Sequence, residues 1–390
     1  MASGNFNDII HDLRLIIKNP YARRIYEYIL SNNPIFFRQK LTRVIGLNID
    51  TINRWIKILS SIGTGFIINI DFEKIGLTQV AFKFNNQLKT SSTERITGLP
   101  ERSKWFLRWK ADAVFPDTRS LLISFAPLST IGIDTILKDY ALVGEIDDYF
   151  IADSYIPNKL PGEFFECDYK YKICMNNWKQ ISEHLKKIAD TFDKREEFSV
   201  LDKKRLRKKR HRIDLLDLLM LSHLEENALY RPQELATKTK STVLKINRHL
   251  RKHILYPQLI NNTRIRYGKH MVKKFALYTF WGRDEPNKTR VLLNEISRIY
   301  GFISGVLDSK SGKFMFMLGV PGHEIFEYAE YMPNTFKELF NEIEAYQLDK
   351  FSIRSYTIPY IPFDRFNKEW SLSEEVIVET KESLMKKGLI

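Results

Sequence analysis

Cysteine is scarce in this sequence of 390 residues, which contains only Cys167 and Cys174. Two cysteines do not make the disulfide framework of a small secreted protein, and their spacing is not the CxxC pattern of common zinc sites. We interpret both as reduced structural thiols. Long apolar runs are lacking too, because nowhere do about 18 apolar residues follow one another, and the first residues do not form a secretory signal. We therefore expect a cytoplasmic protein without a membrane segment.

Catalytic motifs are also missing from the sequence. It contains no phosphate-binding Walker loop, no glycine-rich dinucleotide fingerprint after a strand, no nucleophile elbow and no HExxH zinc motif. We accordingly expect no enzymatic activity, no catalytic residues and no cofactor.

The composition indicates a globular protein with a basic surface. Hydrophobic residues make up 44% and aromatic residues 13% of the chain, enough to bury real cores. A length of 390 residues predicts two to four domains, at about 100 to 200 residues per domain. Sixty-one Lys and Arg against 47 Asp and Glu give a net charge of +14. Such a charge favours a polyanionic partner such as nucleic acid.

A short stretch occurs twice and indicates an internal duplication. Residues 52–54 (Ile-Asn-Arg) recur as residues 246–248, a shift of 194 positions. The same shift superimposes apolar residues that would share one helix face: Leu41 on Leu235, Ile49 on Val243, and Ile56 on Leu250. We interpret the chain as a tandem repeat.

Each copy begins with a pattern typical of a helix-turn-helix. In the first copy, helices are predicted over 20–33, 36–46 and 48–63, with a stop at Gly46. In the second copy they are predicted over 213–227, 231–239 and 240–255, and residues 263–274 alternate around Gly268 like a two-stranded wing. These patterns predict winged helix-turn-helix modules.

Behind each module, strands and helices alternate in the order βαββαβ, which predicts a ferredoxin-like domain. The fold class expected is therefore α+β, a tandem repeat of a winged helix-turn-helix followed by a ferredoxin-like domain. In the first copy the first helix of this domain, near residues 92–99, has a weak pattern. The expected domains are listed by range: winged helix 1–75, ferredoxin-like 76–165, charged helical linker 166–211, winged helix 212–274, ferredoxin-like 275–362 and C-terminal tail 363–390. The linker ends in a basic run, Lys203 to Arg212, interpreted as a solvated linker or as a phosphate-binding arm.

At this point the chain resembles the Lrp/AsnC (feast/famine) family of transcription regulators. The resemblance is carried by the trihelical module, by INIDFEKIGL at residues 68–77 and by the βαββαβ segment behind it, twice over. It implies a DNA-binding regulator, with the fused repeat acting as an internal pseudo-dimer. The glycine-rich effector turn of that family is evident in neither copy, so a small-molecule effector is not supported.

DNA contacts are expected mainly from the second copy. If Val243, Ile246, Leu250 and Ile254 face inward, the remaining positions of that helix face outward. The expected contact residues of this copy are Thr242, Lys245, Arg248, His249 and Lys252 on the helix, and Arg264, Arg266, Lys269 and Lys273 on the wing. Arg248 is the first candidate for a base contact, and the lysines suit phosphates. In the first copy the candidates are Thr51 and Arg54, and we expect that copy to contribute less.

His249 and His253 have the i, i+4 spacing that can hold zinc, but no third ligand is evident in the sequence, so no metal site is expected. The expected partner is double-stranded DNA, with a second copy of the chain as a further candidate, and the expected location is the cytoplasm, at the nucleoid. Two alternatives remain, an architectural DNA-binding protein without sequence preference and a winged-helix module that binds other proteins.

Overall fold

The structure is a computed structural model. It describes residues 19–31, 37–61, 64–88, 99–159, 164–168, 173–193, 211–267 and 274–390. Among these residues, no helix combines the length and the apolar composition needed to cross a membrane.

The chain forms two compact units, and each unit takes segments from both sequence copies. Unit 1 comprises Met1–Ile67, Ser154–Leu201 and Asn262–Ala345, and unit 2 comprises Ile68–Asp153, Asp202–Asn261 and Tyr346–Ile390. Each unit therefore holds the helix-turn-helix segment of one copy and most of the βαββαβ segment of the other. The sequence repeat does not reveal this exchange.

In unit 1 the first helix-turn-helix segment consists of α2 (Pro20–Ser31), α3 (Phe37–Ile45) and α4 (Ile49–Ser61). Asn19 caps α2, because its side chain accepts hydrogen bonds from the backbone N–H groups of Tyr21 and Ala22 at 3.0 and 3.1 Å. Asn48 caps α4 in the same way through the N–H of Thr51, at 2.8 Å. Gly46 follows α3 with φ of 74°, a left-handed conformation that suits glycine at a helix end. The three helices are those predicted.

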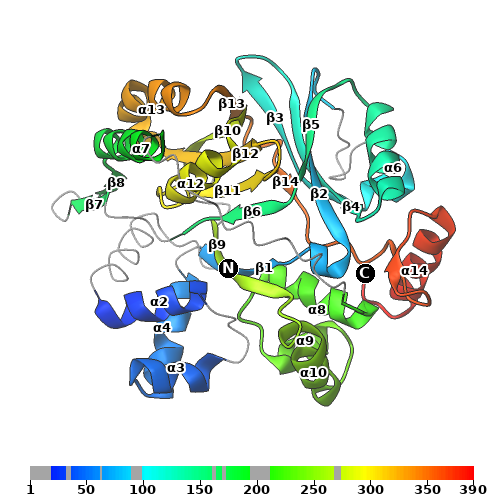
Figure 1. Cartoon of the computed structure of the whole chain (residues 1–390). Coiled ribbons are helices and arrows are strands. Elements are labelled where there is room, and N and C mark those ends of the chain that lie inside the picture. The colour runs from blue at the N-terminus through cyan, green and yellow to red at the C-terminus, as the bar shows by residue number, and fades with distance from the viewer. Residues whose placement is uncertain are drawn as a thin grey trace. The chain divides into compact units, whose positions relative to one another are not determined.

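In unit 2 the second helix-turn-helix segment consists of α8 (Leu215–Glu226), α9 (Pro232–Lys238) and α10 (Val243–His249), drawn in green in Figure 1. A six-residue π-helical turn, η3 (Leu250–Leu255), continues α10 directly. Asp214 and Asp217 form a capping box at the start of α8, in which each side chain accepts the other residue's backbone N–H. Strand β9 (Ile260–Tyr267) comes next along the chain, and the predicted turn of the wing at 268–273 lies outside the described residues.

The ferredoxin-like segment of the first copy lies in unit 2. Its strands and helices are β2 (Leu77–Phe84), α5 (Glu101–Lys104), β3 (Leu107–Phe115), β4 (Ser120–Pro127), α6 (Thr130–Ala141) and β5 (Ile146–Ala152). The strand order β5-β2-β4-β3 is antiparallel throughout. Every residue of β2 is buried, and the ring of Phe82 packs against Tyr140 of α6 with 4.8 Å between ring centroids. Most of the weak helix predicted at 92–99 falls outside the described residues.

The equivalent segment of the second copy lies in unit 1. Its elements are β10 (Phe275–Arg283), α12 (Pro286–Ile296), β11 (Phe302–Leu307), β12 (Lys313–Pro321), the short helix η4 (Gly322–Glu324), α13 (Ile325–Leu339) and β13 (Glu342–Leu348), of which Glu342–Ala345 belong to unit 1. β12 pairs with β10 and with β11, and β6 (Ser154–Pro157) adds an antiparallel strand beside β11. The predicted fold class, α+β with two βαββαβ segments, is confirmed.

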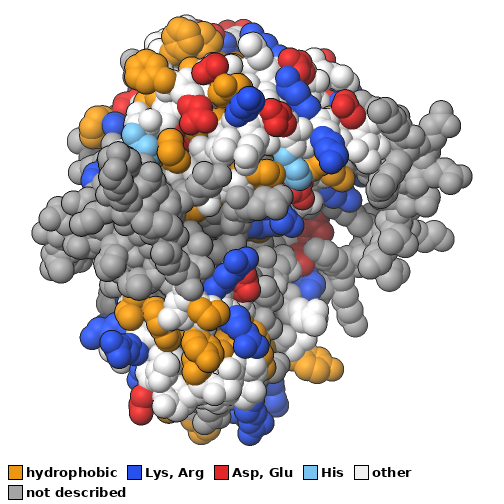
Figure 2. Space-filling model, turned by 90° about the vertical axis from the view of Figure 1, so that its left-hand side faces the viewer, with side chains coloured by type: hydrophobic (Ala, Val, Ile, Leu, Met, Phe, Trp, Pro, Cys, Tyr) orange, Lys and Arg blue, Asp and Glu red, His pale blue; other side chains and the backbone are white. Residues whose placement is uncertain are grey.

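Helix α7 (Trp178–Asp193), from the predicted linker, belongs to the core of unit 1. Trp178 and Leu185 are buried against residues of α12 and α13, and the hydroxyls of Ser182 and Thr335 are 2.6 Å apart. Figure 2 shows acidic and basic side chains interspersed over the upper part of the face it draws. Lys186 of α7 and Glu338 of α13 form one such surface pair, at 2.6 Å.

A buried carboxyl group fastens α7 to this core. Glu324 has none of its surface exposed and accepts hydrogen bonds from Trp178 Nε1 at 2.9 Å and from Asn176 Nδ2 at 3.0 Å. Asn176 ends strand β8 (Ile173–Asn176), which pairs with β7 (Phe165–Asp168). The two short strands and α7 are thus tied to the start of α13 by one polar contact set.

The segment after residue 345 completes unit 2. Its elements are β14 (Arg354–Ser355), β15 (Phe363–Asp364), β16 (Glu369–Trp370) and α14 (Glu374–Lys386). Ile377 and Leu384 of α14 are buried with Leu219 of α8, and Trp370 Nε1 donates to the carbonyl of Ile75 at 2.7 Å. The residues expected as a C-terminal tail therefore contain a packed helix.

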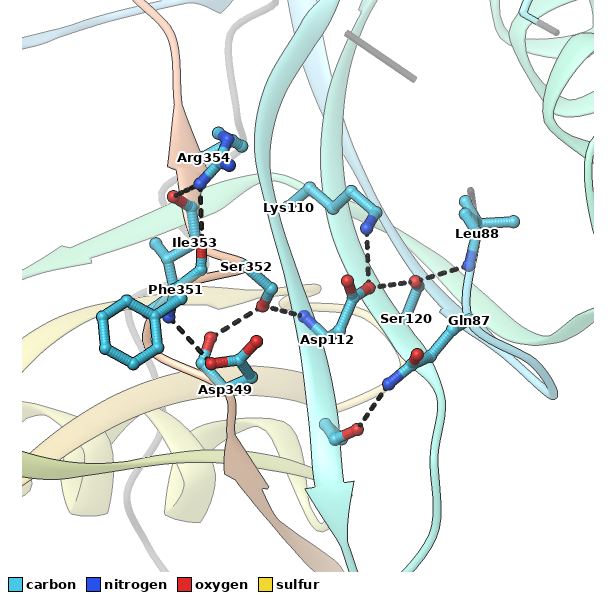
Figure 3. Close-up of polar contacts among 11 residues, drawn as sticks. Gln87, Leu88, Lys110, Asp112, Ser120, Asp349, Phe351, Ser352, Ile353 and Arg354 are labelled. Atoms are coloured by element: carbon cyan, nitrogen blue, oxygen red, sulfur yellow. Dashed lines mark hydrogen bonds and ion pairs between the residues drawn. The ribbon is translucent and has the colours of Figure 1, made fainter. Parts of the chain in front are cut away.

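Unit 2 also holds a buried ion pair, drawn in Figure 3. Lys110 of β3 is fully buried, and its ammonium lies 2.6 Å from Asp112 Oδ1. Ser120 donates to the same carboxylate, and the hydroxyl of Ser352 accepts the backbone N–H of Asp112 at 2.8 Å. These contacts tie β3 to β4 and to the segment before β14.

Candidate metal centre

Four potential metal ligands converge in the second helix-turn-helix segment. They are Asp214 and Asp217 at the start of α8, His249 at the end of α10, and His253 in η3. One ligand atom from each residue lies within 4.8 Å of the others. In the part of the chain that the structure describes, this is the cluster of His, Cys, Asp and Glu side chains with the spacing of a metal site.

The two imidazole rings approach one carboxylate from the same side of the helix. His249 Nδ1 lies 2.9 Å from Asp217 Oδ1, and His253 Nδ1 lies 2.9 Å from Asp217 Oδ2. His249 Nδ1 is also 3.7 Å from Asp214 Oδ1. Tetrahedral zinc with bonds of about 2.0 to 2.2 Å separates its ligand atoms by about 3.3 Å. The two distances of 2.9 Å run to different oxygens of Asp217, and the four ligand atoms lie within 4.8 Å of one another, so they must move closer together to surround an ion.

Burial distinguishes an inner and an outer half of the cluster. The side chain of Asp217 is fully buried and that of His249 is 9% exposed, whereas His253 and Asp214 are 33% and 34% exposed. The inner pair is shielded from water, which strengthens its interaction with a cation. The outer pair leaves a path by which an ion can enter from solvent.

The ionised form of the Asp217 carboxyl group is disfavoured by its surroundings. Burial raises the pKa of Asp217 above its ordinary value, and the nearby Asp214 carboxylate acts in the same direction. Hydrogen bonds from the backbone of Asp214 and from the two histidines oppose that rise in pKa.

The first sequence copy shows that the fold does not require these polar groups. When the capping residues Asn19 and Asp214 are matched, Asp217 corresponds to Ala22, which is also fully buried. When the capping residues Asn48 and Thr242 are matched, His249 and His253 correspond to Trp55 and Leu59. A buried carboxylate costs free energy that Ala22 avoids. The cluster is therefore a feature of the second copy alone and not of the fold.

Sequence reasoning noticed the two histidines and missed the site, because both missing ligands lie on another helix. Asp217 precedes His249 by 32 residues, and no local spacing links them. Comparison of the two sequence copies could have indicated the site, because the second copy has Asp217, His249 and His253 where the first has Ala22, Trp55 and Leu59. No third ligand was evident in the sequence, and the structure places two carboxylates, Asp214 and Asp217, beside the histidines. The expectation that no metal binds there stays untested.

The residues predicted to contact DNA differ in their exposure to solvent. Lys245, Arg248 and Lys252 are exposed as expected, whereas His249 points inward and Val243, expected inward, is 37% exposed. Thr242 is the N-cap of α10 and accepts the N–H of Lys245 at 3.3 Å.

The wing and first-copy candidates differ from the exposed helix residues. Arg264 stacks on the ring of Tyr155, 4.9 Å from its centroid, and donates to its hydroxyl. Arg266 lies in β9, while Lys269 and Lys273 fall outside the described residues. In the first copy Arg54 is exposed and Thr51 is half-buried.

Comparison with known proteins gives no match to a family model and none to a curated protein. Two solved structures match nearly the whole chain, both of the siroheme decarboxylase NirDL. One, in complex with an iron-uroporphyrin III analogue, has 11% sequence identity and a TM-score of 0.46, and the match covers 94% of this chain and 99% of that one. The other has 11% identity and a TM-score of 0.42, with coverage of 98% and 100%.

These comparisons correct the functional predictions. The chain was expected to be a DNA-binding transcription regulator of the Lrp/AsnC family without enzymatic activity, yet the two solved structures named above are of an enzyme. The assignment to that regulator family, the role as a transcription regulator and the exclusion of enzymatic activity were therefore wrong. Double-stranded DNA as a partner, a second copy of the chain and nucleoid association have not been tested and stay predictions.

Proposed function

We propose that this chain is a metal-binding protein whose second helix-turn-helix segment holds one divalent transition-metal ion. The proposal rests on one observation, the convergence of two imidazoles and two carboxylates around a fully buried Asp217. Asp217 and His249 would form the buried side of the site, and Asp214 and His253 would close it.

The ligand types define the class of ion. Magnesium and calcium prefer sites made only of oxygen atoms, whereas imidazole nitrogen suits zinc, cobalt, nickel and iron. Four protein ligands are typical of structural metal sites, because catalytic sites keep one position open. We therefore propose that the ion braces the start of α8 against the end of α10.

The geometry has a competing chemical interpretation, in which each histidine carries a proton on Nδ1 and donates it to Asp217. The two interpretations differ in what occupies Nδ1, a proton or an ion. Metal binding requires both Nδ1 atoms to be free of protons, whereas the hydrogen-bonded arrangement requires a proton on each, so uptake of an ion distinguishes the two interpretations.

The test is metal uptake by the full-length protein after chelation and dialysis. We expect about one cobalt ion per chain, with the visible absorption of a tetrahedral site, and displacement of cobalt by zinc. Asp217→Ala and His253→Leu introduce the residues of the first copy and should abolish uptake without unfolding the chain. His223→Gln is the matched control, because His223 lies on α8 but pairs with Glu226 instead, at 3.4 Å. Absence of uptake, or uptake that both variants retain, would refute the proposal.

A further inference from the structure

The helix that carries His249 and His253 changes its winding between them. α10 is α-helical up to His249, and η3 is π-helical from Leu250 to Leu255. In the first copy the equivalent helix, α4, stays α-helical to Ser61, which corresponds to Leu255. π-Helical turns are rare and occur frequently at functional sites. The difference falls at the residue pair that distinguishes the two copies, His253 and Leu59.

The π-helical turn ends in a left-handed C-terminal cap. Tyr256 donates its N–H to the carbonyl of Arg251, five residues earlier, at 3.0 Å. Leu259 donates to Ile254 and Gln258 donates to Leu255, both at 2.9 Å, and Gln258 has φ of 54°, an arrangement that commonly ends a helix. Contacts from outside the helix reach the carbonyls of this cap.

Those contacts come from the link that leads into the sheet of unit 2. Lys74, in the short helix η2 (Glu73–Ile75), donates its ammonium to the carbonyls of Pro257 and Gln258, at 3.1 and 2.9 Å. The N–H of Asp71 donates to the carbonyl of Leu259 at 2.8 Å. η2 ends at Gly76 and continues directly into β2, an inner strand of the sheet. A change in the winding of η3 would move these carbonyls and break their hydrogen bonds to Lys74 and Asp71.

Resting on the metal site proposed above, we propose that the ion controls the winding of η3 and, through Lys74 and Asp71, the link into β2. With the ion bound, the π-helical turn is held because His253 is fixed beside Asp217. Without the ion, residues 250–255 relax to the α-helical form of the first copy. A π-helical turn accommodates one residue more than an α-helical turn. Its loss therefore rotates the residues that follow by about 100° and shifts them by about 1.5 Å along the helix axis. The carbonyls of Pro257 and Gln258 then leave Lys74.

Hydrogen exchange on the full-length protein, with zinc chloride or with a chelator, tests this relay. Zinc should slow amide exchange in residues 250–259, at Asp71, and at Ile75 and Gly76 next to Lys74. With zinc at about 100 times its Kd, the slowing can reach about 100-fold. Asp217→Ala should remove these effects. Lys74→Met should keep the effect of zinc on residues 250–259 and at Asp71, whose N–H contacts the carbonyl of Leu259 directly, and should lose most of the effect at Ile75 and Gly76.

The outcomes separate this inference from the proposed function. If the protein binds no cobalt or zinc, the metal site itself is refuted and the relay with it. If it binds metal but exchange of residues 250–259 does not change, the metal site stands and the relay is refuted. If Lys74→Met protein shows the same zinc effect at Ile75 and Gly76 as the unchanged protein, the role of Lys74 is refuted.

Discussion

Glu324 makes the stability of unit 1 depend on pH. Burial raises its pKa from the ordinary 4.5 to about 7, and the hydrogen bonds from Asn176 and Trp178 offset only part of that rise. A pKa raised in the folded state adds stability below the ordinary value, and this contribution is lost as the pH rises through about 7. The free energy of unfolding of unit 1 should therefore fall by about 3 kcal/mol between pH 4.5 and pH 7.

Glu324→Gln should remove this pH dependence, because glutamine keeps the shape and the acceptor for Trp178 but does not titrate. Urea unfolding at pH 5 and pH 8 measures the difference for both proteins. Glu330→Gln, at an exposed position of α13, which begins directly after Glu324, is the control and should follow the unchanged protein. An equal pH dependence in Glu324→Gln protein would show that the buried carboxyl is not its source.

The candidate site shows what single residues reveal in the sequence and what they hide. His249 and His253 were recognisable by their spacing, because two positions four apart share a helix face. Asp214 and Asp217 looked like ordinary capping residues, which they also are. Their second role depends on how α8 packs against α10, and a helix pattern fixes which residues face inward but not which partner they meet.

Strand β3 contains a buried ion pair on which its stability depends. Lys110 is buried in this strand with Asp112 as its counter-ion, so removing the negative charge leaves a buried cation unpaired. Such a loss typically costs about 3 to 5 kcal/mol, whereas replacing both partners can be nearly neutral. Asp112→Asn should therefore destabilise unit 2 by about this amount, and adding Lys110→Met should recover most of it. Urea unfolding of the single and double variants measures the coupling, with the exposed Asp134→Asn as control. Additive losses would argue against the ion pair.

Most helices and strands could be predicted from the sequence, because their periodicity and caps are local. Asn19, Gly46 and Thr242 mark helix ends as expected, and the βαββαβ order was readable from alternating patterns. The π-helical turn could not be predicted, since Leu250 to Leu255 carry an ordinary helical pattern. The pairing partners of the short strands β6 and β14 could not be predicted, because each pairs with a strand of the other copy.

At the scale of the whole molecule, each unit is built from segments of both sequence copies, and this predicts how two separately expressed halves of the chain behave. Residues 1–201 and 202–390 each contain one sequence copy, but each unit needs segments from both. Each half expressed alone should therefore be poorly folded, and mixing the two should restore the circular dichroism and cooperative unfolding of the intact chain. Two halves that fold independently and gain nothing on mixing would contradict the exchange. A cut at residue 201 is a fair test, because residues 194–210 lie between α7 and α8.

Two compact units should also give two unfolding transitions that respond to different conditions. Metal binds only to unit 2 in the proposed site, so zinc at about 100 times its Kd should add about 2.7 kcal/mol to that unit and raise its Tm by several degrees. Glu324 belongs to unit 1, so raising the pH from 5 to 8 without metal should lower the other transition. Scanning calorimetry of the intact chain can assign each transition, because Asp217→Ala should abolish the zinc response alone and Glu324→Gln the pH response of unit 1 alone. A single transition that moves with both conditions would contradict the independent unfolding of the two units.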